Sequence, residues 1–197
     1  MIVPTLGGYM SDPFGFSVAP SFAAPKIVKA VKRLLSFRSR FFSFRKNAAN
    51  GLIDALIENA GFSPFGLCVE KSEKPFSYMI DGGDIHISIG LFKRTSPKAF
   101  FSVLLHEIAH VYIGYEETYK DLKRLDKEFL YKYGDVLSDA TCSPVEVYAR
   151  IAALSVLNEL LKLPDCAKIR TKILFCVDHE QNKIKNIKKR IDELTNI

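Results

Sequence analysis

The chain has 197 residues, 48% of them hydrophobic, which suits one ordinary domain with a buried core. No apolar run reaches the roughly 18 residues that a transmembrane helix needs, so no membrane span is expected. The four cysteines show no C-x-x-C spacing. They favour free thiols in a reducing, intracellular compartment such as the cytoplasm, with a Cys166–Cys176 disulfide as the alternative. No secretory signal is recognised, because no charged segment is followed by an apolar run.

The net charge of +6 is concentrated near the N-terminus. Residues 1–50 contain eight Lys or Arg residues and one acid, so they contribute +7 and the remainder −1. Residues 1–25 are rich in Gly, Pro, Ser and Phe and are expected to be irregular. Residues 26–46 interleave cations with Val, Leu and Phe, as in a basic amphipathic helix or an extended basic segment. Such a segment suits binding to nucleic acid, an anionic membrane surface or an acidic protein, or organellar transit, and the alternative is a solvated, partly disordered arm. We therefore predict a basic N-terminal arm over 1–46 and a main domain over 47–197.

Three short segments have the composition of β-strands. They cover residues 66–71, 76–80 and 85–89, and they follow a helix expected at 50–61. The last segment alternates strictly, with isoleucines on one face and His86 on the other. A small sheet of three or four strands, mostly antiparallel, is therefore expected. His86 is interpreted as a residue of its surface or of a cleft rim rather than as a metal ligand.

A long apolar helix is predicted directly after the sheet. Ser96 and Pro97 provide an N-cap and a proline in the first turn, and Gly114 is a plausible C-terminal stop. Between them, large apolar side chains occupy nearly every face of the helix, which is typical of a buried element. Polar side chains in such a helix need partners, because burying them alone is unfavourable.

The pentapeptide His106-Glu107-Ile108-Ala109-His110 lies inside this helix. Histidines four residues apart share one helical face, about 6 Å apart along the axis, so both imidazoles can reach one Zn²⁺. Glu107 follows the first histidine, where it can remove a proton from a metal-bound water. The pattern predicts a hydrolase with zinc on His106 and His110 and with Glu107 as general base.

A catalytic zinc needs a third protein ligand and an open position for water. The metzincin arrangement is excluded, because position 113 is isoleucine instead of glycine, position 116 is Glu116, and no methionine follows Met79. Another solution places a glutamate on a second helix. Ser143 and Pro144 begin such a helix, which is expected to end before Pro164.

Glu146, in the first turn of this second helix, is the predicted third ligand. The alternatives are Asp139 and Glu116, and Asp139 can also serve by accepting a hydrogen bond from a ligand histidine. Three tyrosines are candidates for stabilising an oxyanion: Tyr112, Tyr115 and Tyr148.

The two helices resemble those of zincin metallopeptidases of the gluzincin type, in particular the ImmA/IrrE-like minimal zincins. The resemblance covers about residues 75–160 and depends on the HExxH motif and on Glu146-x-x-Ala149-x-x-Ala152-Ala153. Arg150 and Ala152 stand where this family usually has Asn and Phe. The resemblance implies an α+β fold, with a small sheet beside the motif helix and a helical C-terminal part. It also implies that the strand before the motif helix edges a cleft and pairs with extended peptide substrate.

We therefore predict a zinc-dependent metallopeptidase that acts on a peptide or protein substrate. Zn²⁺ is expected on His106, His110 and Glu146, with Glu107 as general base. The alternative is a zincin-fold protein without protease activity that serves in binding or assembly through its basic arm. Further helices are expected over residues 166–177 and along the final apolar stripe that contains Ile187 and Ile191.

Overall fold

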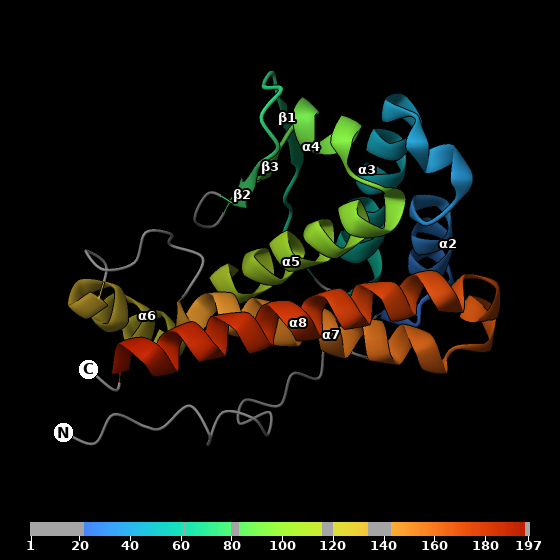
Figure 1. Ribbon diagram of the computed structural model, residues 1–197. Helices are drawn as coiled ribbons and strands as arrows, with labels where there is room; N and C mark the ends of the chain where they lie inside the picture. The colour runs from blue at the N-terminus through green and yellow to red at the C-terminus, as the bar shows by residue number, and fades with distance from the viewer. Residues whose placement is uncertain (1–21, 61, 80–82, 116–119, 134–142, 196–197) are drawn as a thin grey trace.

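The computed structural model describes residues 22–60, 62–79, 83–115, 120–133 and 143–195 (Figure 1). Within them the architecture is α+β, with many helices and one small sheet. The predictions that fall outside the described residues concern residues 1–21, Glu116, Asp139, Cys142 and the side chain of Tyr115.

The basic segment near the N-terminus forms a helical hairpin. Helix α2 (Pro25–Leu34) is joined through the 3-10 turn η2 (Phe37–Arg40) to helix α3 (Phe42–Ala60). α2 is a basic amphipathic helix, one of the two forms expected within residues 26–46, because its apolar face is buried in the main core while its cations face outward. The boundary predicted at residue 46 lies inside α3, and α2 shares a core with the motif helix.

The three predicted strands pair into one sheet. β1 (Leu67–Glu70), β2 (Ser77–Met79) and β3 (Ile85–Ser88) lie in the order β1-β3-β2. β3 runs parallel to β1 and antiparallel to β2, so the sheet is mixed and the prediction of a mostly antiparallel sheet is wrong. The reason is that β3 lies between β1 and β2: it forms a hairpin with β2, which precedes it in the chain, and its other edge pairs with β1 in the same direction. As predicted, the isoleucines of β3 are buried and His86 lies on the other face, bonded to Glu70 through Nδ1 at 2.7 Å.

The junction between β3 and the motif helix is tightly built. Ser88 caps the short helix α4 (Ile89–Arg94) by accepting a hydrogen bond from the Leu91 backbone N at 3.1 Å. The backbone N of Gly90 donates to the Ser72 carbonyl at 2.8 Å. A Cβ added at Gly90 would lie 2.2 Å from the Glu73 carbonyl oxygen, so only glycine fits there.

A buried arginine fixes the end of α4. The guanidinium of Arg45 donates to the carbonyls of Phe92 and Thr95 at 2.6 and 2.9 Å and lies over the ring of Phe100. Burial lowers the pKa of Arg45 to about 10, which still leaves the side chain charged at neutral pH. Arg45 therefore ties the N-terminal hairpin to the start of the motif helix.

The rest of the described chain is helical. α5 (Pro97–Tyr115) contains the motif, and α6 (Lys120–Tyr133), α7 (Pro144–Lys162), η4 (Pro164–Ile169) and α8 (Arg170–Thr195) follow. α8 runs alongside α5 and α7 as one continuous helix, since residues 170–195 contain no Gly or Pro to divide it (Figure 1). Among the described helices, none has the length and apolarity needed to cross a bilayer.

Two glycines provide a matched test of the α4 junction. Gly90→Ala is expected to lower the free energy of unfolding by about 1–3 kcal/mol, because the new methyl group meets backbone atoms. Gly51→Ala is the control, since its Cβ would meet nothing within 4 Å and lies inside α3. This control should gain about 1 kcal/mol from helix propensity. Urea denaturation of both variants measures the difference, and equal stabilities would contradict this packing.

The described cysteines Cys68, Cys166 and Cys176 are free. Burial raises the pKa of Cys176 to about 12 and also shields its thiol from solvent. Iodoacetamide at pH 8 should therefore leave Cys176 unmodified in the native protein and alkylate it readily in guanidinium chloride. Peptide mass spectrometry resolves the site, and rapid native alkylation would show that the core around α8 is open.

Candidate metal centre

The two helices that carry the predicted ligands pack directly against each other. α7 presents alanines on the side that faces α5, and small side chains allow the helix backbones to approach closely. These residues are Ala149, Ala152 and Ala153. The close approach places the first turn of α7 opposite the middle of α5.

The start of α7 is fixed by two caps. Ser143 Oγ accepts a hydrogen bond from the Glu146 backbone N at 3.5 Å, and Pro144 occupies the first turn as predicted. From α6, the carboxylate of Asp126 accepts from the Val145 backbone N at 2.9 Å. Both contacts satisfy backbone donors that a helix leaves free at its N-terminus. They thereby fix the backbone from which the Glu146 side chain extends.

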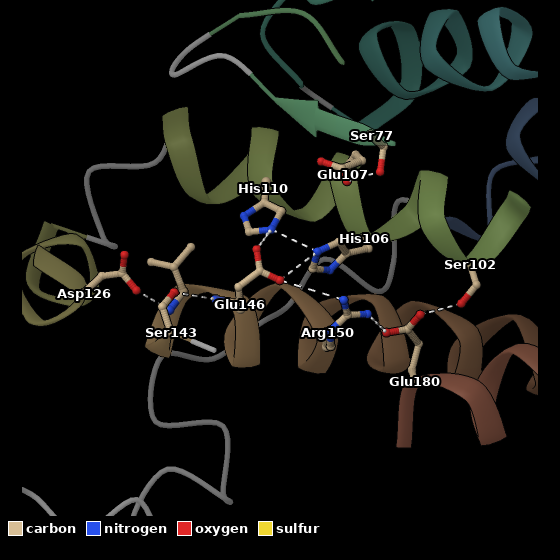
Figure 2. Close-up of polar contacts among 11 residues, drawn as sticks. Ser77, Ser102, His106, Glu107, His110, Asp126, Ser143, Glu146, Arg150 and Glu180 are labelled. Atoms are coloured by element: carbon tan, nitrogen blue, oxygen red, sulfur yellow. Dashed lines mark hydrogen bonds and ion pairs between the residues drawn. The ribbon is translucent and has the colours of Figure 1, made fainter. Parts of the chain in front are cut away.

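His106, His110 and Glu146 converge on one point between the helices (Figure 2). Nε2 of His106 lies 3.1 Å from Glu146 Oε2, and Nε2 of His110 lies 3.0 Å from Glu146 Oε1. The two Nε2 atoms are themselves 3.1 Å apart. The structure thus brings together all three predicted ligands, on side chains that are buried or largely buried.

This group could hold a divalent metal ion. Around a tetrahedral zinc with bonds of about 2.0–2.1 Å, ligand atoms lie about 3.3–3.4 Å apart, so small side-chain shifts would admit the ion. Two imidazoles and a carboxylate suit zinc and other first-row metals. Burial by itself would raise the pKa of Glu146, but hydrogen bonds from His106 and His110 outweigh it and hold that pKa well below its usual range. The carboxylate is therefore ionised, as a metal ligand must be.

The second ring nitrogen of His106, Nδ1, is buried and lacks a hydrogen-bond partner among the described residues. A metal-bound histidine normally donates its second N–H to an acceptor, which fixes the ring. Asp139 was predicted as such an acceptor, or as a ligand, and stays a prediction.

Glu107 is buried and lies apart from the three ligands. Its Oε1 atom accepts a hydrogen bond from Ser77 Oγ at 2.7 Å, and Figure 2 shows the two side chains turned toward each other. Ser77 lies on β2, the edge strand that packs on α5. The prediction that the strand before α5 edges the site is thus wrong: β3 is central, and β2 is the strand beside Glu107.

A buried charged network extends from the candidate ligand. Arg150, one turn after Glu146, places its Nη2 atom 3.8 Å from Glu146 Oε2 and its Nη1 atom 3.0 Å from Glu180 Oε2. Glu180 of α8 is only 1% exposed and also accepts a hydrogen bond from Ser102 of α5 (Figure 2). Sequence reasoning missed this network, because Ser102 and Glu180 are far apart in sequence. The only available signal was the four-residue spacing of Glu146 and Arg150.

The remaining sequence candidates have packing roles. Tyr148 is buried between α5 and α7, and the ring of Tyr112 lies 5.5 Å from that of Phe62. His86 stacks on Tyr78 and is outside the three-residue group. A role of either tyrosine at an oxyanion stays a prediction.

Comparison with known proteins identified no related protein. No family profile matches the chain, and no curated protein or solved structure resembles it significantly. The function is therefore inferred from the chain's own residues.

The buried ion pair gives a stability prediction. Arg150→Met leaves the Glu180 carboxylate buried without its cation, which is expected to lower the free energy of unfolding by about 3–5 kcal/mol. The double variant Arg150→Met/Glu180→Met removes both charges and should recover most of that loss. The exposed pair Lys26–Glu58 is the control, and Lys26→Met should change stability by less than about 1 kcal/mol. Additive losses in the double variant would show that Arg150 and Glu180 are not coupled.

Proposed function

We propose that the protein is a zinc-dependent metallopeptidase with a minimal zincin fold of the gluzincin type. The observation that carries the proposal is the convergence of His106, His110 and Glu146 from two helices, with Glu107 directly after the first histidine. A three-ligand group leaves a fourth position for water, as catalytic zinc sites do. The small sheet beside α5 and the helices after it agree with this fold.

The chain's own groups have distinct roles in this proposal. Bound zinc would supply an acidified water as the nucleophile. Glu107 takes a proton from that water on its carboxylate and later gives it to the leaving amine. The hydroxyl of Ser77 holds one oxygen of that carboxylate and so sets its orientation. Ser77 is therefore a positioning residue rather than a proton carrier.

The edge of β2 offers a binding site for extended peptide. The Ser88 backbone N donates to the Phe76 carbonyl, and β2 pairs with β3 in antiparallel register. Hydrogen-bonded pairs alternate in such a ladder, so the backbone groups of Ser77 point away from β3. An added substrate strand can pair with them, which would bring its backbone next to Glu107.

Metal content tests the ligand set. Wild-type protein should bind one zinc per chain, while His110→Ala and Glu146→Ala should lose nearly all of it, because two remaining ligands bind zinc weakly. His86→Ala is the control, since His86 lies outside the group and should not affect metal content. Plasma mass spectrometry of dialysed protein provides the measurement. Full occupancy in both ligand variants would refute the proposed centre.

Activity tests the chemistry separately. Glu107→Gln keeps the size of the side chain but removes the base, so zinc content and melting temperature should stay near wild type. Peptide cleavage should fall by about 10²–10⁴-fold. If wild-type protein binds zinc yet cleaves nothing in a broad peptide library, the peptidase proposal fails. The alternative, a zincin-fold protein that serves in binding or assembly without protease activity, would then be favoured.

A further inference from the structure

The described part of the chain exposes four phenylalanine side chains, and they gather at one end of the molecule. Two of them, Phe37 and Phe41, are 65% and 64% exposed. Lys172 of α8 donates to the Leu35 carbonyl just before η2, and η2 contacts α5, so these segments adjoin (Figure 1). We call this set the phenylalanine patch: Phe37, Phe41, Phe42 and Phe175.

Cations accompany the rings of the phenylalanine patch. The guanidinium carbon of Arg40 lies 4.4 Å from the centroid of the Phe37 ring, and Lys98 Nζ lies 3.6 Å from that of Phe175. Arg38 lies on the same 3-10 turn. Residues 13–53 contain no Asp or Glu, so the chain around η2 carries positive charge that its own segment does not neutralise. The patch therefore favours an anionic partner.

The geometry favours a lipid surface over nucleic acid. Single-stranded nucleic acid binds through bases that stack on aromatic faces, but Phe37 and Phe175 each have a face covered by a cation. Exposed rings with cations beside them suit the boundary between acyl chains and headgroups, where the rings are buried and the cations meet phosphates. We infer that the phenylalanine patch binds the surface of a bilayer that contains anionic lipid.

Vesicle flotation with the full chain tests the contribution of charge to binding. Binding to vesicles with one-third phosphatidylglycerol should exceed binding to pure phosphatidylcholine and should weaken in high salt. Arg38→Gln/Arg40→Gln should reduce the partition coefficient about 30-fold, since each cation contributes roughly fivefold. Lys127→Gln/Lys132→Gln is the charge-matched control on α6, at the other end of the molecule, and should change it less than about twofold (Figure 1).

The absence of tryptophan from the chain permits a site-specific test of insertion. Phe41→Trp introduces a single indole, whose emission should shift to shorter wavelength on vesicles and be quenched by brominated acyl chains. Tyr131→Trp, at a position 96% exposed on α6, should show neither effect. Phe37→Ser/Phe41→Ser should weaken binding about tenfold or more.

Two results would overturn the inference. One is equal binding by the arginine variant and its lysine control. The other is binding to single-stranded RNA that is lost in the arginine variant, with no binding to anionic vesicles, which would assign the patch to nucleic acid. Circular dichroism of each variant ensures that losses are not caused by unfolding.

Discussion

The close contact between α5 and α7 is the constraint on which the candidate centre depends. Glu146 lies 36 residues after His110, and only this packing brings it within reach of the same ion as the two histidines. The alanines of α7 make the contact possible, because larger side chains would separate the two backbones. The caps on the first turn of α7 then fix Glu146, so the geometry follows from packing and helix termini before any metal binds.

The charged network around Arg150 links the helices that form the site, but burying its charges has a desolvation penalty. Buried ion pairs are often no more stabilising than apolar side chains of similar size, because desolvation offsets their attraction. Arg150 contacts the candidate ligand on its own helix and Glu180 on α8, while Ser102 links Glu180 to α5. One buried network thus connects the three long helices beside the site. An apolar side chain in place of Arg150 could fill the same space, but it would not attract the carboxylate of Glu146.

Local features were predictable from the sequence, whereas through-space partners were not. The start of α7 at Ser143 and Pro144 and the alternation in β3 follow from short-range rules of capping and strand pattern. The order of the sheet depends on long-range pairing, so the edge position of β2 and the role of Ser77 emerged only from the fold. Arg45 was likewise counted among the cations of the basic N-terminal arm, although it is buried and its guanidinium binds the carbonyls at the end of α4.

The phenylalanine patch and the candidate metal centre lie at different positions along α5. Lys98 is in its first turn, and the motif histidines begin eight residues later, which corresponds to a rise of about 12 Å. The turn η2 contacts α5, and none of its residues belongs to the three-residue group of candidate ligands. We therefore expect the proposed bilayer binding and the proposed zinc binding to be separable. Loss of bilayer binding in the Arg38→Gln/Arg40→Gln variant should leave zinc content unchanged, because these arginines of η2 belong neither to the three-residue group nor to the Arg150 network.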